Sequence, residues 1–566
     1  MDRNREALGV QGEQASRLFP QHQRKQAGRL LSLGSRKQAR RLRYIQVAIL
    51  LILTAVSVSC PRPSGPWRSE LYPVDWTPEA TYAGGRFLHD FSYAGYHYGE
   101  DPLPDAKIGP PVFDVATAYG ADNTGVADAT TAIQNAIDAA EVAGGVVYLP
   151  AGLYRCDGVL RVDEPGVTIR GDGADATKLY FTKSQDMAYK SHITFQGSVS
   201  RGPEIPLAVD GENRAFDVFV NDASSLSPGD EVSLGWVITD DFVAEHGMTG
   251  TWQAFNGNWQ AIFRRTVVAV DTAANPDRVT LDVPLRYPAL VRDGASLRKE
   301  SGYLSECGVE DLALANAVDW DDAWDIYQVH ILLFSGVKDC WVRGVDSFAS
   351  PYPPADGYHL QSCGIEVVNS KRVTVADSVM QTAQNRGGGG CGYLFEISQS
   401  NEVLIRDCAG LDGRHNFIQN WGFGTTGCVF LRCYSAGSTN LAYRNLPVGL
   451  PANNEYHHSL AMANLVDQCT LDDGWYAGNR KNESSGAGHT STQCVFWNTD
   501  GRGVLRSFQY GTGYVIGTEN IRVDVSLANG PAQGTAPADY VEGEGRGAQL
   551  VPESLYEDQL EGRIGN

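Results

Sequence analysis

Short apolar segments recur along the second half of this chain at intervals that suit one coil of a solenoid. They begin at residues 340, 372, 402, 428, 464 and 494, so consecutive starts lie 26 to 36 residues apart. One such segment cannot bury its own apolar face, whereas segments stacked at strand spacing, about 4.8 Å, cover one another. The repeat therefore predicts stacked β-coils with long loops on one side, where function is expected.

A helical pattern before the repeats predicts a cap. Residues 113–154 read FDVATAYGADNTGVADATTAIQNAIDAAEVAGGVVYLPAGLY. We expect Asp128 at the N-cap, because a short side-chain oxygen accepts from the free N–H groups of a first turn. Apolar residues follow at helical spacing, and Gly144-Gly145 ends the helix before a short strand. A helix here would cover the open end of the coiled sheet.

This segment, followed by GVTIRGDG at residues 166–173, resembles the cap and first rung of pectate-lyase-like proteins. The resemblance covers roughly residues 110–525. It implies an all-β fold, a right-handed parallel β-helix with an N-terminal capping helix. The characterised members of this superfamily mostly act on polysaccharides, so the resemblance also implies a glycan substrate. It specifies the fold much more closely than the reaction.

The parts outside the regular coil differ in composition. Residues 61–109 are rich in Pro, Tyr and Asp and are expected to form an extension that lies on the barrel. Residues 201–300 interrupt the repeat with hairpin-like strands, which predicts a β-rich insertion or subdomain. Its aromatic residues are expected to bury the insertion itself, with a cleft wall as the alternative: Trp252, Phe255, Trp259 and Phe263. Residues 526–566 have a weak pattern and predict a loose tail.

Residues 1–60 have the features of an export signal. Basic residues between 36 and 43 precede an apolar run at 45–58, and Ser59-Cys60 follows. The run is short for a transmembrane span, although an uncleaved anchor is the alternative. Cys60 after small residues resembles a bacterial lipoprotein signal, with Ser57 where such signals usually carry Leu. We therefore expect a periplasmic, cell-surface or extracellular protein, with lipidation of Cys60 as a possible outer-membrane anchor.

The rest of the chain is strongly acidic. Residues 60–566 carry 35 Lys/Arg and 64 Asp/Glu, a formal charge of −29. This charge argues against a general nucleic-acid binder, and a polyanionic substrate would need a locally basic cleft or a bridging cation. Ten cysteines follow Cys60, mostly inside strand-like segments, so we expect stacked, buried free thiols rather than disulfides. No Cys or His spacing indicates zinc, and the protein is expected to be a monomer.

Charged, polar and aromatic side chains gather between residues 410 and 500, in equivalent loops of successive coils. Since equivalent positions stack in a solenoid, residues about 30 apart become neighbours and predict a single patch. We expect catalytic roles for Arg414, His415, His458, Asp473 and Arg480. We expect substrate contacts from Asp412, His457, Trp475, His489, Trp497 and Asn498. The Arg414-His415 and Trp497-Asn498 pairs also resemble a motif of a largely uncharacterised branch of the superfamily.

The favoured chemistry is β-elimination by a polysaccharide lyase acting at a uronic acid. A lyase neutralises the carboxylate beside C5, removes the C5 proton and protonates the leaving oxygen. Arg414 or Arg480 would be the clamp, and His415 or His458 the base. Alternatively, Arg414 and His415 only hydrogen-bond the loop backbone and fix its turn.

Two other functions stay open. A glycoside hydrolase needs two carboxylates roughly 5–5.5 Å or 6.5–9.5 Å apart, and Asp412 could pair with Asp472 or Asp473. The polygalacturonase order of motifs is absent, since Asn498-Thr499-Asp500 follows the Asp-Asp pair. Asp472-Asp473-Gly474 is more typical of a turn, and its carboxylates could also bind Ca²⁺. A non-catalytic glycan-binding surface protein is the third candidate.

Two unusual segments lie outside this patch. The glycine-rich run RGGGGCG at residues 386–392 has no helix or Lys-Ser/Thr after it, so it predicts a close-approach loop near the cleft floor rather than a phosphate loop. The acidic run DWDDAWD at residues 319–325 is expected to be a solvated loop, with a sugar platform or a cation site as alternatives.

Overall fold

The computed structural model describes residues 65–106, 111–352, 356–441, 444, 449–526 and 537–565. All of them lie in the second of two units of the chain, Pro63–Asn566. The expected export segment and Cys60 lie outside the described residues. Within the described ranges, no helix combines the length and the apolar character needed to cross a lipid bilayer.

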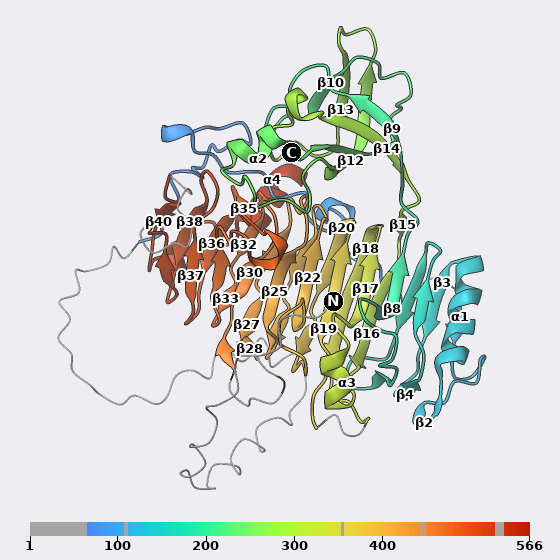
Figure 1. Cartoon of the computed structure of the whole chain (residues 1–566). Coiled ribbons are helices and arrows are strands. Elements are labelled where there is room, and N and C mark those ends of the chain that lie inside the picture. The colour runs from blue at the N-terminus through green and yellow to red at the C-terminus, as the bar shows by residue number, and fades with distance from the viewer. Residues whose placement is uncertain are drawn as a thin grey trace, which may run out of the picture. The chain divides into compact units, whose positions relative to one another are not determined.

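Parallel strands from successive coils pair into three ladders, which Figure 1 shows as stacked arrows along the coil. Ladder A contains β1 Val112–Asp114, β3 Gly145–Tyr148, β6 Val167–Arg170, β15 Leu304–Ser305, β16 Gly308–Ala315, β18 Val337–Ser347, β20 Lys371–Ala376, β23 Leu404–Arg406, β26 Val429–Leu431, β32 Leu465–Asp467, β36 Val495–Thr499, β38 Tyr514–Thr518 and β40 Tyr540–Glu542. The six repeated segments of the sequence supply β18, β20, β23, β26, β32 and β36, which pair in this order. The predicted parallel β-helix is confirmed.

The other two ladders complete each coil. Ladder B contains β2 Thr124–Asp128, β4 Gly152–Cys156, β7 Thr177–Phe181, β21 Val379–Gln381, β24 Ala409–Leu411, β27 Tyr434–Ala436 and β33 Thr470–Leu471, joined through the long strands β16 and β18. Ladder C contains β5 Leu160–Val162, β8 Ser191–Gln196, β17 His330–Ser335, β19 Cys363–Val368, β22 Tyr393–Ser398, β25 His415–Asn420, β30 Asn454–Tyr456, β34 Trp475–Ala477, β37 Val504–Ser507 and β39 Arg522–Asp524. Two short pairs lie beside them, β28 Thr439–Asn440 with β29 Leu450–Pro451 and β31 Ala461–Met462 with β35 Ser491–Thr492.

The core lies inside the coil, where equivalent residues of successive strands stack. Phe195 packs on Phe334 at 4.7 Å between ring centroids, and Phe395 packs on Phe417 at 5.0 Å. Both pairs are register partners across one coil. The ten cysteines of the described ranges are free and buried, which confirms the prediction of stacked thiols.

The capping helix forms where the pattern predicts it, and Figure 1 shows it beside β3 at one end of the coil. Helix α1, Thr130–Ala143, buries Ile133, Ala136 and Ile137 against the first coil. Its N-cap is Ala129 rather than Asp128. Asp128 precedes the cap, and its Oδ1 accepts from Thr130 N at 2.9 Å, so it closes the turn that leads into the helix.

The insertion is an antiparallel sheet with its own core. Its strands are β9 Ser200–Pro206, β10 Asp217–Val220, β11 Glu231–Val237, β12 Trp259–Asp271, β13 Asp277–Leu281 and β14 Ser296–Ser301, in the order β10-β13-β12-β11-β14-β9, with α2 Asp240–Glu245 beside them. Trp252, Phe255 and Phe263 are buried in this core, as expected. Trp259 is only partly buried and packs under the Arg298 guanidinium at 4.5 Å.

Both ends of the described chain pack on the outer face of ladder A. Leu71, Phe91 and other residues of the extension share an apolar cluster with Val495 and Trp497. The predicted loose tail is wrong for residues 537–565, because β40 pairs with β38 and α4, Leu555–Ile564, buries Leu555 in the same cluster. The apolar outer face of ladder A needs cover, and the two ends supply it.

A buried carboxyl anchors α4. Asp467 Oδ2 accepts from Ser554 Oγ at 2.8 Å and from Tyr556 N at 2.9 Å, while Oδ1 has no partner. Burial raises the pKa of Asp467 from its ordinary 3.8 to about 7, although these hydrogen bonds oppose the change. Because the pKa is raised in the folded state, the protonated carboxyl stabilises the folded protein. This contribution is complete below pH 3.8 and is lost as the pH rises through 7.

Replacing this carboxyl by its neutral isostere should therefore stabilise the protein only at alkaline pH. We expect Asp467→Asn to unfold at a higher temperature than the parent at pH 8, by an amount equivalent to about 1–3 kcal/mol, and at the same temperature near pH 4. The matched control is Asp472→Asn, since Arg502 holds the pKa of Asp472 below its usual range. Thermal unfolding followed by circular dichroism tests this, and equal effects of the two variants at pH 8 would contradict it.

Candidate functional site

The outer face of ladder C carries titratable side chains that are far apart in sequence. Successive side chains of a strand point to opposite faces, so every second residue of each rung faces outward. One such column runs through Glu366, Glu396, Ile418 and Glu455, which are register partners on consecutive rungs. The stacking thus brings carboxylates together that the sequence separates by up to 89 residues.

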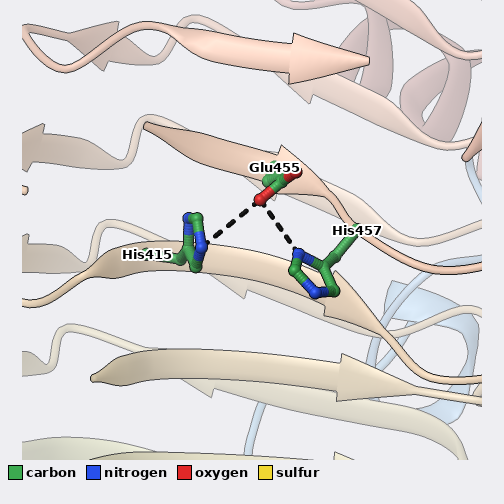
Figure 2. A group of neighbouring side chains, drawn as sticks. All are labelled: His415, Glu455 and His457. Atoms are coloured by element: carbon green, nitrogen blue, oxygen red, sulfur yellow. Dashed lines mark hydrogen bonds and ion pairs between the residues drawn. The ribbon is translucent and has the colours of Figure 1, made fainter. Parts of the chain in front are cut away.

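The most compact group on this face consists of His415, Glu455 and His457 (Figure 2). Glu455 Oε2 lies 3.3 Å from His415 Nε2 and 2.9 Å from His457 Nδ1. His415 begins β25, while Glu455 and His457 come from β30 and the residue just after it. Their side chains are nearly covered, with residue exposures of 6%, 4% and 4%.

Arg480 supplies the positive charge of this group. Its Nε lies 3.0 Å from Glu455 Oε1, and its Nη1 donates to His457 Nδ1 at 2.7 Å. His415 Nδ1 must donate to the carbonyl of Asn453, 2.6 Å away, which leaves Nε2 as an acceptor. Three atoms that carry lone pairs therefore converge, namely His415 Nε2, Glu455 Oε2 and His457 Nδ1. Such a set could bind a metal ion, but the guanidinium of Arg480 already supplies the positive charge next to Glu455.

Both histidines of the group are neutral near pH 7. Burial lowers the pKa of His415 to about 3, and Glu455 only partly opposes this effect. Burial, followed by the charge of Arg480, holds the pKa of His457 well below its ordinary value. A neutral imidazole with a free lone pair can accept a proton, and Glu455 can stabilise the imidazolium that forms.

The loop at residues 480–488 covers the group. Ser484 Oγ lies 3.2 Å from His457 Nε2, and His458 Nε2 donates to the Ser484 carbonyl at 2.6 Å. His458 also stacks on Trp421, with ring centroids 4.5 Å apart. The structure therefore places His458 beside the group as an anchor of the loop, not as the predicted base.

Arg414 lies at the edge of the group, next to a hollow. Its Cζ lies 5.6 Å from the ring centroid of Tyr393, whose ring is 5.4 Å from that of His415. Arg414 Nη1 donates to the Gly387 carbonyl at 2.5 Å, and within the described ranges no carboxylate pairs with it. The glycine-rich loop thus lies beside the group, as expected for a close-approach loop.

A hollow of about 390 Å³ opens on the other side of this loop. Its lining consists of Tyr189, Trp324, Tyr327, Asn385 and residues 387–389. Trp324 belongs to α3, Trp320–Asp325, so the acidic run is a short helix capped by Asp319 and not the expected loop. Aromatic walls on a glycine floor are suited to the apolar face of a sugar ring.

The predicted Asp residues do not join the group. Asp473 accepts from Asn416 at 3.0 Å, Ser435 at 2.9 Å and Ser438 at 2.8 Å, so it holds a turn between coils. Asp472 instead pairs with Arg502 at 2.5 Å. Asp472 and Asp473 therefore engage different partners, which agrees with the turn that the sequence favours here. Asp412, exposed in a left-handed turn with φ 55°, is likewise apart from the group.

Two predicted substrate contacts lie in the interior. Trp475 is 1% exposed and packs between Phe430 and Tyr456, each at 5.2 Å between centroids. Its side chain points from β34 into the core of the coil. His489 is 1% exposed and lies under the insertion, 5.0 Å from the ring of Tyr510. Neither side chain can contact a substrate in this structure.

The Trp497-Asn498 pair lies on a different ladder from the group. Trp497 is fully buried in the cluster outside ladder A, edge-on to Tyr72 at 5.8 Å. Asn498 Nδ2 donates to the Glu553 carbonyl at 2.9 Å, which fixes the segment before α4. Both residues attach the chain ends to the barrel; the buried Trp497 is not available for the predicted substrate contact, and Asn498 lies apart from the group.

Sequence reasoning brought Arg414, His415, His457 and Arg480 together but did not assign a role to Glu455. The signal was present in the alternation Glu455-Tyr456-His457, which places two polar side chains on one face of a strand and an aromatic residue on the other. Tyr393 gave no such signal, because its place beside His415 follows from the register of β22 and β25.

Comparisons with known proteins agree with this architecture. Residues 112–227 match the family model "Rhamnogalacturonase A/epimerase, pectate lyase-like". The chain folds as a parallel β-helix, and this segment of it is similar to pectate-lyase-like proteins. Mannuronan C5-epimerase AlgE1 of Azotobacter vinelandii is 38% identical over 116 residues, which is 19% of this chain and 8% of that protein.

Solved structures are similar to this chain at low sequence identity and with TM-scores below 0.5. The A-module of mannuronan C-5 epimerase AlgE6 from Azotobacter vinelandii is 12% identical, with a TM-score of 0.33 over 76% of this chain and 94% of that one. The tailspike protein gp49 of Pseudomonas phage LKA1 is 14% identical, with a TM-score of 0.36 over 72% of this chain and 76% of that one.

The pairing of Arg480 with Glu455 can be tested by stability. Arg480→Met leaves the buried carboxylate without its guanidinium, so we expect the free energy of unfolding to fall by about 3–5 kcal/mol. Glu455→Gln in the same background should restore part of the loss, because it removes the uncompensated charge. Denaturant unfolding gives the values, and Arg502→Met, at an exposed ion pair, should cost at most about 1 kcal/mol. A similar loss in both single Arg variants would contradict the pairing.

Proposed function

We propose that this protein is an enzyme that removes the C5 proton of a uronic acid in a polysaccharide, as a lyase acting by β-elimination. The observation that carries the proposal is the outer face of ladder C, where neutral His415 adjoins Glu455 and where Arg414 has no carboxylate partner among the described residues. The basic and apolar segment at residues 36–58 supports export, with Cys60 as the proposed lipid anchor, to the surface where polysaccharides occur.

Each requirement of the elimination has a residue. Arg414 would neutralise the uronate carboxylate, which makes the C5 proton more acidic. His415 would accept this proton at Nε2, because Nδ1 is held by the Asn453 carbonyl. Tyr393, whose ring lies 5.4 Å from that of His415, would protonate the leaving oxygen through its hydroxyl. Arg480 balances the charge of Glu455, so Arg414 is the cation left for the substrate carboxylate.

Substrate access requires a movement of the covering loop. Gly387 lines the hollow and accepts from Arg414 through its carbonyl, so a polymer in the hollow would approach Arg414 across this loop, whereas His457 is accessible only when Ser484 moves away. Opening would let water reach His415, and its pKa would rise towards the ordinary value near 6.5, where a base is most effective at neutral pH. The closed conformation described above is then the resting form.

Epimerisation at C5 is the second candidate. Removal of the proton is common to both reactions, and they differ in whether the carbanion expels the leaving group or takes a proton from the other face. The similarity to a protein named as a mannuronan C5-epimerase favours this alternative. A hydrolase is less well supported, because Glu455 and Glu396 are engaged by separate histidines.

Activity of the purified protein on polymannuronate and polygalacturonate separates these functions. A lyase produces an unsaturated uronide that absorbs in the ultraviolet, an epimerase incorporates solvent deuterium at C5, and a hydrolase yields only reducing ends. We expect the first product, and His415→Gln should lower its rate by about 10²–10⁴-fold. A glycan-binding protein would give none of the three signals.

A matched pair of arginine variants tests the clamp. Arg414→Ala should lower kcat/KM at least tenfold and leave the thermal midpoint nearly unchanged, since Arg414 forms no ion pair in the part of the chain that the structure describes. Arg502→Ala removes a similar charge at a 78% exposed side chain and should have no effect on the rate. Full activity of Arg414→Ala would refute the proposed binding mode.

A further inference from the structure

A second group of titratable residues lies on the same face, on β17, β19 and β22. His330 Nε2 is 3.1 Å from Glu396 Oε2, and His330 Nδ1 is 3.5 Å from Glu366 Oε2. The side chains are 6%, 5% and 18% exposed for His330, Glu396 and Glu366. One ligand atom from each residue lies within 4.8 Å of the others.

The charge of this group is not balanced by the protein. Within the described residues, no Lys or Arg forms an ion pair with Glu366 or Glu396. The other partners of Glu396 are neutral, Asn420 Nδ2 at 2.7 Å and Ser398 Oγ at 3.4 Å. With both carboxylates ionised, even a protonated His330 would leave one net negative charge in a nearly covered site, and such a charge is costly to bury.

The neighbouring group shows what is missing. Glu455, with two histidines, has the guanidinium of Arg480 within 3.0 Å. Glu366 and Glu396, with one histidine, carry more negative charge and have no such partner. Their excess charge therefore calls for a cation from solution, and the contacts from Asn420 and Ser398 would orient Glu396 as an outer shell.

We propose that His330, Glu366 and Glu396 bind one divalent transition-metal ion, with Zn²⁺ as the preferred ion. Two carboxylate oxygens and one imidazole nitrogen form a mixed donor set that suits Zn²⁺, whereas Ca²⁺ and Mg²⁺ prefer oxygen alone. Cys363 is the register partner of His330, so a thiol stands beside the site and adds to this preference. His330 would turn to direct one nitrogen to the ion, and the ion would link three successive rungs.

Direct metal binding tests the proposal without any substrate, so its outcome is independent of the proposed reaction. The whole protein is freed of metal with a chelator and dialysed against Zn²⁺, Mn²⁺ or Ca²⁺. We expect one equivalent of tightly bound Zn²⁺, weaker Mn²⁺, no Ca²⁺ under the same conditions, and a higher midpoint of thermal unfolding with Zn²⁺. Absence of Zn²⁺ binding at micromolar concentration would overturn the proposal.

Matched variants in the two groups locate the ion. Glu366→Gln and His330→Gln should lose Zn²⁺ binding at least tenfold and lose the thermal shift, whereas Glu455→Gln should keep both. Loss of binding in Glu455→Gln with retention in Glu366→Gln would place the ion elsewhere and refute the assignment. Folding is controlled in the metal-free state, where Glu366→Gln should unfold at the same or a higher temperature than the parent, since it removes a buried negative charge.

Discussion

Parallel hydrogen bonding between successive coils is the constraint on which the rest of this protein depends. Each strand pairs in register with the strands of the coils above and below it. A residue that faces outward on one strand therefore has outward-facing neighbours on both sides. The same rule stacks Phe395 on Phe417 inside the barrel and sets Glu366 beside Glu396 outside it. The core residues and the titratable residues thus lie on opposite faces of the same ladder. A shift of register by one residue would turn the core side chains outward and the titratable side chains inward.

Charge compensation distinguishes the two groups on ladder C. Burying a carboxylate is tolerable only when a cation or several hydrogen bonds accompany it. Arg480 meets this need for Glu455, and its rigid, permanently charged fork makes the compensation independent of pH. At Glu366 and Glu396 the protein offers one imidazole for two carboxylates. The first group is thus complete within the chain, while the second is complete only with a ligand.

The fold was largely predictable from the sequence, because the repeat near 30 residues and the pattern of the capping helix are both visible in short stretches of chain. The site was predictable only in part. Stacking correctly joined His415 to His457 and Arg480, which occupy outward or loop positions of neighbouring coils. It failed for Trp475 and Trp497, because spacing alone does not say whether a residue faces the interior, the cleft or the surface covered by α4. The docking of the chain ends depends on contacts across more than 400 residues, such as Trp67 with Leu550, which no local pattern reveals.

The covering loop connects the stability of the site with its chemistry. Ser484 and Ser485 have φ of 49° and 65°, a region that costs free energy for residues other than glycine. The hydrogen bonds to His457 and His458 compensate for this strain, so the loop is held down by the same histidines that it covers. Opening would relieve the backbone and hydrate the imidazoles together, at the loss of two hydrogen bonds. Under the proposed function, a site whose imidazoles are buried and neutral beneath the loop would become more basic when a polymer displaces the loop.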